Sequence, residues 1–276
     1  MSLYETVSKE LIDDELWSLI EPQLPARASH NRQYAGRKPT PDRAVLTGIV
    51  FVLRSGIAWN LLPQEMGCGS GTACWRRLVA WQEAGVWQRI HETLLAELRR
   101  RGEIDLSRAL VDSSSIRAML AGKKRGPNPT DRRKLGSKHH LIVDAKGIPL
   151  AVILSEANRH DVTQLDALVD AIPHIRGKRG RPLHKPQIVQ GDRGYSSEAH
   201  RQRLRKRGIT PMLAKIGSPH GSGLGKTRWP VERSIAWLHS FRRLKIRYER
   251  YAHVHEAFLS LAYALICWTR LKPTFN

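Results

Sequence analysis

Apolar side chains recur at helical spacing through the first hundred residues, with proline and glycine between the sets. An acidic run at 13–15 precedes the apolar residues of 16–20, and Pro22 then interrupts the pattern, which predicts a short helix. Three further sets at intervals of three and four residues predict three more helices. Their predicted starts are Thr40-Pro41, the end of the glycine-rich turn 67–71, and Val86. Residues 1–101 are therefore expected to form an all-α domain, either a helix-turn-helix DNA reader or a plain helical bundle.

From residue 108 the helical spacing gives way to short apolar runs typical of strands. Residues 109–111 and 187–190 predict buried strands that end at Asp112 and at Asp192. The other predicted elements are a hairpin formed by 138–143 and 148–154 around a turn at 144–147, a helix at 162–172, a basic helix capped by Ser196-Ser197, a strand at 209–213, a helix that carries Glu232, and a last helix at 254–271. Strands alternating with helices predict an α/β fold, so residues 102–276 are expected to form a second domain.

The charge of the chain narrows the class of partner. Lys and Arg number 46 against 25 Asp and Glu, which gives a net charge of +21 and a pI near 10.6. Such an excess favours a polyanionic partner, and nucleic acid is the commonest one. An anionic membrane would attract the same charge, but membrane-binding proteins usually concentrate it in one amphipathic helix. Here the basic residues are spread over the chain, which favours DNA or RNA.

Cysteine usage and hydropathy indicate where the protein works. The three cysteines form no CxxC pair and no zinc pattern, as expected for reduced thiols. The first ten residues contain no apolar signal region, and the most apolar stretch, 258–268, is too short to span a bilayer. We therefore expect a soluble, cytoplasmic protein that meets its polyanion in the nucleoid.

Three carboxylates are candidates for catalysis. Asp112 and Asp192 each follow a predicted strand, and the carboxyl ends of strands are where open α/β sheets place ligands. If the two strands are neighbours, the carboxylates converge, and two like charges then require a cation between them. Pro230 suits the first turn of a helix, so Glu232 would lie near a helix start and complete the set. Such oxygen ligands suit Mg²⁺ or Mn²⁺, and three acids suffice for two ions.

Each of these acids also has an ordinary structural interpretation. An Asp after a strand is more often a turn or helix cap than a metal ligand, and Glu232 could be a first-turn helix acid. Asp144 is expected to begin the hairpin turn, Asp161 to cap a helix, and Glu198 to lie in the first turn of the basic helix. The pattern alone therefore leaves a three-acid metal site and isolated structural carboxylates both open.

Three motifs, taken in order, resemble a known family. They are Val111-Asp112-Ser113, Gly191-Asp192-Arg193-Gly194-Tyr195, and Trp229-Pro230-Val231-Glu232-Arg233 followed by Trp237 and Phe241-Arg242-Arg243-Leu244. They resemble the catalytic motifs of bacterial insertion-sequence transposases, most closely the group named after insertion sequence five. The stretch from Leu16 through 59–63 and 75–78 resembles the same group, so the similarity extends over nearly the whole chain.

This resemblance implies an RNase H-like core, a mixed sheet with helices on both faces, that carries a DDE triad. Asp112, Asp192 and Glu232 match its first, second and third acids. The resemblance further implies two Mg²⁺ ions per active site, with Mn²⁺ as an alternative. Double-stranded DNA, as transposon ends and target, would be the substrate, and a homodimer is expected because two ends must be brought together.

The family signature around the glutamate is only half kept. It consists of Tyr, two residues, Arg, three residues, Glu, six residues and Lys. Arg228 and Glu232 match the Arg and the Glu, whereas Gly225 stands at the Tyr position and His239 at the Lys position. A lysine contact after the glutamate is therefore missing, and Arg242, Arg243 or Lys245 is expected to supply the phosphate contact instead.

Basic segments surround the three acids along the chain. They are residues 123–134, 200–207 and 242–250, and their single-signed charge favours contact with the DNA backbone. Trp229 is the aromatic residue best placed to touch DNA or wedge a displaced base. The expected DNA-binding residues are Arg228, Trp229, Arg233, Lys123, Lys124, Arg201, Arg205, Arg242, Arg243 and Lys245.

Three functions fit these observations. The first is an active transposase that cleaves at transposon ends and transfers a 3′-hydroxyl strand into target DNA. The second is a structure-selective nuclease with the same core, which cuts but never joins. The third is a DNA-binding protein without catalysis, which the presence of all three acids disfavours. Tyr195 beside Asp192 is expected to pack or touch DNA and not to act as a nucleophile.

Overall fold

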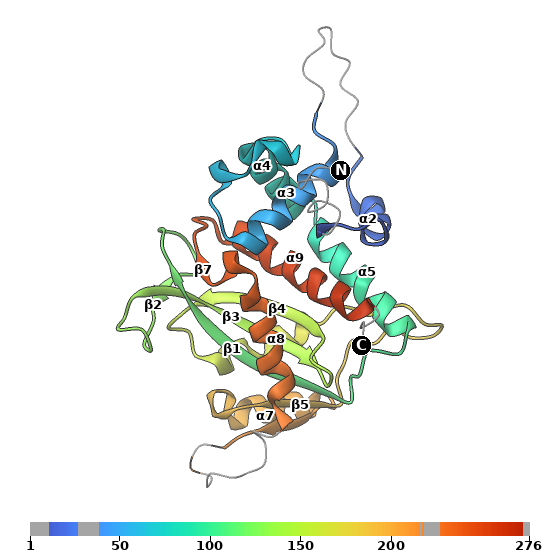
Figure 1. The fold of residues 1–276 in the computed structure, drawn as a ribbon. Coiled ribbons are helices and arrows are strands. Elements are labelled where there is room, and N and C mark those ends of the chain that lie inside the picture. Colours follow the sequence, from blue (N-terminus) through green and yellow to red (C-terminus); the bar gives the residue numbers. More distant parts are fainter. Residues whose placement is uncertain (1–10, 27–38, 216, 218–226, 273–276) are drawn as a thin grey trace.

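A mixed β-sheet forms the centre of the molecule. This computed structural model describes residues 11–26, 39–215, 217 and 227–272. Within them, seven strands join one sheet. These strands are β1 (Arg108–Ala118), β2 (Gly126–Pro127), β3 (Leu135–Asp144), β4 (Pro149–Glu156), β5 (Ile188–Gly191), β6 (Thr210–Leu213) and β7 (Ile246–Arg247). Figure 1 shows the sheet below the N-terminal helices.

The order of the long strands is that of an RNase H-like core. β4, β3 and β1 pair antiparallel, and β5 and β6 continue the sheet from β1 in parallel. The β3–β4 hairpin forms as expected, because Asp144 accepts the backbone N–H groups of Lys146 and Ile148 at 2.9 and 2.7 Å, and Gly147 adopts a φ of +81°. The fold class expected from the sequence is confirmed.

Helices cover both faces of this sheet. On one face, Leu110 and Val143 are opposite each other across β1 and β3 and pack against Val231 of α8 (Trp229–Ser240). His139 of β3 points the same way and stacks on His255 of α9 (Ala252–Leu271), with ring centroids 5.2 Å apart. Its neighbours in β3 point to the opposite face, as the period of a strand requires. That face is covered by α6 (Leu165–Asp170), which contacts β3 and β4.

The N-terminal helices lie as the apolar spacing predicts. They are α2 (Asp14–Ile20), α3 (Asp42–Ser55), α4 (Gly71–Glu83) and α5 (Val86–Arg100), and the side chains of Asp13 and Ser70 cap α2 and α4. α9 packs against α4 and α5 on one side and β4 on the other, so one hydrophobic core runs from the N-terminal helices into the sheet (Figure 1). The division into domains 1–101 and 102–276 stays a prediction.

Some local predictions were wrong in detail. β1 continues seven residues past the predicted apolar run, so Asp112 lies inside the strand opposite Leu141 and not at its end. The run of Asp and Ser after Val111 hid this, because hydrogen bonding to β3 holds the polar residues in the sheet. Asp161 caps no helix; its carboxylate binds Lys138 instead. The predicted start of α3 at Thr40-Pro41 is confirmed, with Pro41 at the N-cap position.

The remaining elements position the candidate site. A 3₁₀ turn at Asp161–Gln164 precedes α6, a second at Arg193–Tyr195 follows β5, and α7 (Glu198–Lys206) leads to β6. Ser197 caps α7 and Glu198 lies in its first turn, as predicted. The short turn Arg242–Leu244 joins α8 to β7. The predicted helix at 162–172 is thus a 3₁₀ turn followed by a shorter α-helix.

Candidate active site

The three predicted acids come from three different elements. Asp112 lies in the middle of β1, and Asp192 follows β5, the parallel neighbour of β1. The Asp192 carboxylate accepts the backbone N–H of Gly194 at 2.9 Å, which fixes the turn after β5. Glu232 lies in the first turn of α8, where Pro230 occupies a first-turn position as expected. The β1–β5 pairing brings the two strand-borne acids to one region of the sheet.

The guanidinium group of Arg228 lies between the two aspartates. Its Nη2 contacts Asp112 Oδ2 at 2.9 Å, and its Nη1 lies 3.7 Å from Asp192 Oδ2. Arg228 is the residue before α8, and its carbonyl accepts the N–H of Glu232 at 3.4 Å. A single side chain therefore supplies the positive charge that two converging carboxylates require.

The acids also interact through their charges. Burial is the main cause that raises the pKa of Asp112 to about 6, and the charges of Asp192 and Glu232 contribute to this rise. Arg228 and the backbone N–H of Ser113 act in the opposite direction and lower this pKa. Asp112 thus senses both other acids, although Glu232 itself is exposed to solvent.

The donor chemistry of this region fits divalent metal ions. Carboxylate oxygens are the ligands that Mg²⁺ and Mn²⁺ prefer, and the only close counter-charge to Asp112 and Asp192 among the described residues is Arg228. In the described part of the chain, however, no three His, Cys, Asp or Glu side chains are gathered closely enough to hold one ion. In this structure the positive charge beside Asp112 and Asp192 is that of Arg228.

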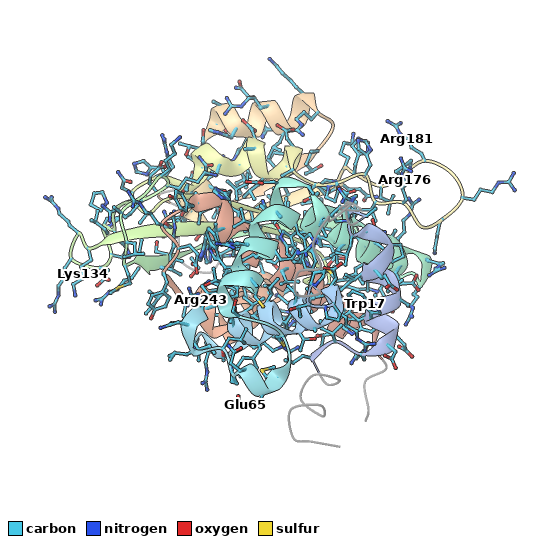
Figure 2. The ribbon with its side chains drawn as sticks, turned by 90° about the horizontal axis from the view of Figure 1, so that it is seen from above. Trp17, Glu65, Lys134, Arg176, Arg181 and Arg243 are labelled. Carbon is cyan, nitrogen blue, oxygen red and sulfur yellow. The ribbon has the colours of Figure 1, made fainter. Side chains whose placement is uncertain are left out.

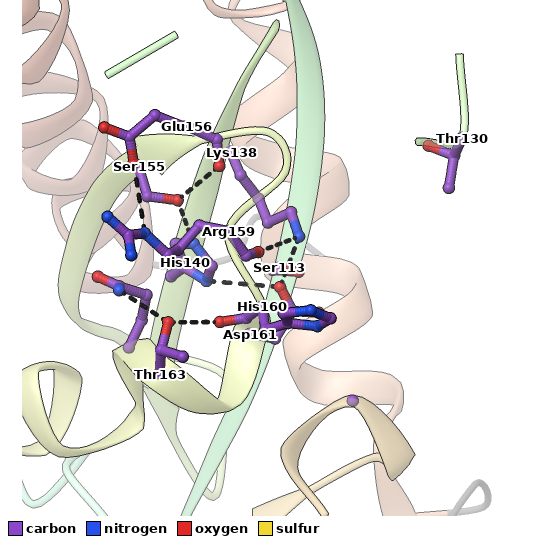
Figure 3. A network of polar contacts seen from close by, with 12 residues as sticks. Ser113, Thr130, Lys138, His140, Ser155, Glu156, Arg159, His160, Asp161 and Thr163 are labelled. Carbon is purple, nitrogen blue, oxygen red and sulfur yellow. Dashed lines mark hydrogen bonds and ion pairs between the residues drawn. The ribbon is translucent and has the colours of Figure 1, made fainter. Parts of the chain in front are cut away.

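A fourth acid, Asp161, was not predicted for this site. A Cβ atom added to Gly194 would lie 3.1 Å from Asp161 Oδ2 and 3.1 Å from Asp192 Oδ1. The two carboxylate oxygens are therefore at most twice that distance apart. Lys138 on β3 neutralises Asp161 at 2.8 Å, and the imidazole of His140 lies 3.8 Å away (Figure 3). The nearby Asn158-Arg159-His160 sequence gave no spacing that would have revealed this contact.

Tyr195 lies buried beside these acids. Burial raises the pKa of its hydroxyl well above the ordinary value, and the charges of Asp161, Asp112 and Asp192 raise it further. The side chain is fully shielded from solvent and belongs to the main hydrophobic core. Tyr195 therefore packs in the core, which is one of the two roles expected for it. A neutral, buried phenol is a poor nucleophile.

Two of the predicted DNA-binding arginines are buried. Arg201 donates to the carbonyls of Leu213 and Ala214, and Arg243 pairs with Glu249 at 2.8 Å. Figure 2 shows Lys134 and Arg181 at the margin of the molecule and Arg243 within its outline. Because their guanidinium groups already have protein partners, both residues hold the fold together.

The other predicted DNA-binding residues are accessible to different degrees. Lys124 pairs with Glu256 at 2.6 Å and Arg205 with Glu198 at 2.9 Å, both near the surface. The side chains of Trp229, Lys123, Arg242 and Lys245 are exposed. Arg233 stacks between two indoles of α8, with its guanidinium carbon 4.5 Å from the Trp229 ring and 4.4 Å from the Trp237 ring.

His239, at the position of the missing lysine, faces β1. Its Nε2 lies 3.4 Å from the hydroxyl of Ser114, and burial lowers the pKa of the imidazole. His239 therefore borders the same sheet face as Asp112 but does not carry a lysine's permanent charge. Gly225, at the tyrosine position, lies outside the described residues.

The state of the three cysteines and the length of the apolar segments were also predicted from the sequence. Cys68, Cys74 and Cys267 are free and buried. None of the described helices is long and apolar enough to cross a bilayer.

Comparison with protein families gives two matches. The model described as "Transposase DDE domain" matches residues 104–267. The model described as "Putative transposase of IS4/5 family" matches residues 12–91. Asp112, Asp192 and Glu232 all lie within the first match.

Curated relatives are similar over parts of the chain. A putative transposase for insertion sequence element IS402 of Burkholderia cepacia is 62% identical over 149 residues, which cover 54% of this chain and 71% of the relative. A 16.2 kDa protein of the same element is 59% identical over 123 residues, 45% of this chain and 84% of the relative. The transposase of IS1106 from Neisseria meningitidis serogroup B is 29% identical over 130 residues, 44% of this chain and 40% of the relative.

Among solved structures, the Mos1 strand transfer complex matches with 13% identity and a TM-score of 0.30, covering 89% of this chain and 83% of the other. The Mos1 paired-end complex with Mn matches with 12% identity and a TM-score of 0.28, covering all of both chains. These TM-scores are too low to establish a shared fold.

Proposed function

The chain belongs to the family of transposases that carry the DDE domain, and from this premise we propose that Asp112, Asp192 and Glu232 are its catalytic acids. Transposases of this type act on DNA with divalent metal ions. We propose two Mg²⁺ ions per active site, with Mn²⁺ able to replace them. The substrates are the double-stranded ends of an insertion sequence and its target DNA, and two copies of the chain hold the two ends as a homodimer in the cytoplasm.

One observation carries this assignment. Arg228 contacts Asp112 at 2.9 Å and lies 3.7 Å from Asp192, although β1 and α8 are 110 residues apart in sequence and β5 lies between them. Two buried or half-buried carboxylates that share one cation keep uncompensated negative charge, so the site favours binding of a further cation. Asp192 also caps the 3₁₀ turn after β5, but capping alone does not account for the cation that it shares with Asp112.

Each residue of the site would have its own role in DNA cleavage and strand transfer. When bound, the metal ions lower the pKa of the attacking water or 3′-hydroxyl and stabilise the leaving oxygen. Asp112 and Asp192 provide oxygen ligands from two adjacent strands, and Gly194 holds the Asp192 carboxylate in place through its N–H. Glu232 is solvent-exposed on α8 and closes the site by a side-chain movement. Arg228, once released, binds a phosphate oxygen of the DNA through its guanidinium fork.

The proposed DNA path follows exposed cations. Lys123, Arg242 and Lys245 are exposed and bind the DNA backbone, and Trp229 is exposed at the start of α8 beside Glu232. A net charge of +21 gives such contacts a long-range attraction. DNA affinity should consequently fall steeply as salt concentration rises.

The test separates cutting from joining. Asp192→Asn should abolish both cleavage of a transposon-end duplex and strand transfer from a precut end, while duplex affinity at low salt stays close to that of the wild type. Arg181→Gln, a charge change in a surface loop, is the matched control. Unchanged excision by Asp192→Asn would refute the catalytic assignment. Cleavage without any strand transfer by the wild-type protein would identify it as a structure-selective nuclease, and binding without either reaction as a DNA-binding protein.

A further inference from the structure

A cavity lies where the ends of three helices meet, away from the three acids. Its volume is about 340 Å³, and α3, α8 and α9 contribute its walls. The lining residues are Arg54, Trp237, Ser240, Phe241, Ile266, Thr269 and Arg270. This volume is at the lower end of the range for small-molecule sites, so the cavity can take one compact ligand.

Two of the lining residues are cations without a counter-charge. Arg54 at the end of α3 and Arg270 at the end of α9 form no ion pair and no side-chain hydrogen bond within the described ranges. Both side chains are exposed at the rim of the cavity, and partial burial lowers the pKa of Arg54. The cavity thus concentrates positive charge that the protein itself does not balance, which favours an anionic ligand.

The other walls are aromatic and weakly polar. Trp237 and Phe241 line the cavity from α8 and the residue after it. Arg233 lies over the Trp237 ring at 4.4 Å, which fixes the orientation of the indole. Ser240 and Thr269 add hydroxyl oxygens that already donate to carbonyls of their own helices and remain able to accept. A flat ring system with polar edges suits these walls better than an aliphatic chain does.

We propose that this cavity binds a single nucleotide, with its base against Trp237 and its phosphate between Arg54 and Arg270. Guanidinium groups recognise phosphate oxygens in pairs of hydrogen bonds, and an indole stacks on any base. The combination of two unpaired arginines with an aromatic wall matches a molecule that is anionic at one end and planar at the other. A free phosphate would leave the aromatic wall unused, and a neutral aromatic ligand would leave the arginines unpaired.

The position of Trp237 gives two sources for such a nucleotide. Trp237 follows Glu232 by five residues on α8, a rise of about 7.5 Å and a rotation of about 140° around the helix axis. One source is an unpaired nucleotide of DNA that passes around α8 from the proposed active site, and a free mononucleotide is the other. The DNA source rests on the proposed function, whereas binding of a free mononucleotide does not.

The first experiment measures binding of deoxyadenosine monophosphate to the full-length protein by calorimetry. Arg54→Gln and Arg270→Gln should each weaken binding about tenfold or more, since each removes charge-assisted hydrogen bonds. Trp237→Leu should weaken it similarly, and Trp237→Phe should retain most of the affinity because a ring remains. Arg181→Gln is the control for loss of one positive charge, and far-ultraviolet circular dichroism verifies that each variant is folded.

The second experiment uses duplex DNA that ends in an unpaired 2-aminopurine nucleotide, whose fluorescence is quenched when the base stacks. Quenching that is lost in Trp237→Leu and Arg54→Gln, but kept in Arg181→Gln, identifies DNA as the source. Mononucleotide binding without such quenching identifies the free nucleotide. If neither probe responds to Arg54, Arg270 or Trp237, the proposal is wrong. Asp192→Asn separates the two ideas, because losing catalysis through that substitution leaves nucleotide binding intact.

Discussion

Two clusters of carboxylates and cations in this molecule have opposite electrostatic outcomes. At the candidate active site, the pKa of Asp112 is raised to about 6, despite contact with Arg228. In the second cluster, Glu249 is only 3% exposed, and burial alone would raise its pKa, yet hydrogen bonds and charges from His255 and Arg243 lower it. The more deeply buried carboxylate is therefore the better stabilised one.

The difference lies in how completely each cluster is closed. Glu249 accepts Arg243 at 2.8 Å and His255 at 3.1 Å, and His255 in turn contacts His139 at 2.9 Å. Each carboxylate oxygen of Glu249 has its own donor. At Asp112, one arginine serves two aspartates, and two like charges remain nearby. A closed cluster stabilises a fold, whereas an under-compensated cluster is prepared to accept a cation.

The largest effect is expected from breaking the closed cluster. Glu249→Gln leaves Arg243 charged and buried without its partner, and removing one member of a buried pair costs about 3–5 kcal/mol. Urea unfolding monitored by circular dichroism measures this loss. Glu256→Gln, which breaks the half-exposed pair with Lys124, is the control and should cost less than about 1 kcal/mol. Equal losses in the two variants would show that burial is not decisive here.

The next effect has the opposite sign. Because the folded-state pKa of Asp112 is about 6, above its usual 3.8, the folded protein holds a proton that the unfolded chain has released between these values. This carboxylate therefore costs stability as pH rises from about 4 to 6, by roughly 3 kcal/mol once fully ionised. Asp112→Asn should stabilise the metal-free protein at pH 7.5 and lose that advantage near pH 4. A stabilisation that does not depend on pH would contradict the electrostatic account.

Removing the shared cation should affect metal binding. Arg228→Gln deletes the charge that competes for Asp112 and Asp192, so Mn²⁺ should bind the DNA-free protein roughly tenfold more tightly, the free energy of one pKa unit. Calorimetric titration with Mn²⁺ measures this, with Arg233→Gln on the same helix as the control. Weaker Mn²⁺ binding in Arg228→Gln would mean that Arg228 organises the acids and does not compete with the ion.

The smallest effects are expected on the exposed DNA path. Lys123→Gln and Lys245→Gln should each weaken duplex binding modestly and reduce the slope of log affinity against log salt by about one. Fluorescence anisotropy over a salt series provides the readout. Arg207→Gln is the comparison, because this arginine is held by Asp170 at 2.6 Å. If the salt slope stays unchanged in the lysine variants, the DNA runs elsewhere.

The sequence predicted the order of elements well, because apolar spacing and turn chemistry act locally. The β3–β4 hairpin and the position of Pro230 in the first turn of α8 follow from a few neighbouring residues. The length of β1 was not predicted. Its polar half, beginning at Asp112, is a strand because it pairs with β3, and a local sequence pattern does not reveal such long-range pairing. Resemblance to a family, and not periodicity, made the three acids a specific prediction.

The sequence could not separate binding arginines from structural ones. Arg201 and Arg243 lie in basic runs that resemble DNA-contact segments. Both are nevertheless buried, Arg201 against the carbonyl of Leu213 and Arg243 against Glu249. Arg228 and Asp161 illustrate the converse. Their contacts with Asp112 and Lys138 join residues far apart in sequence, so the electrostatic balance of the site emerges only from the folded chain.

α9 has a consequence for how the protein is made. It supplies apolar side chains to α5 on one side and to the sheet on the other, yet about 150 residues separate the end of α5 from its start. At ribosomal rates of 5–20 residues per second, the N-terminal helices wait on the order of ten seconds for this packing partner. During that interval the apolar faces that pack on α9 lack this partner. The N-terminal helices and the sheet consequently complete their packing together, at the end of synthesis. A nascent chain is therefore not expected to bind DNA before α9 has been made.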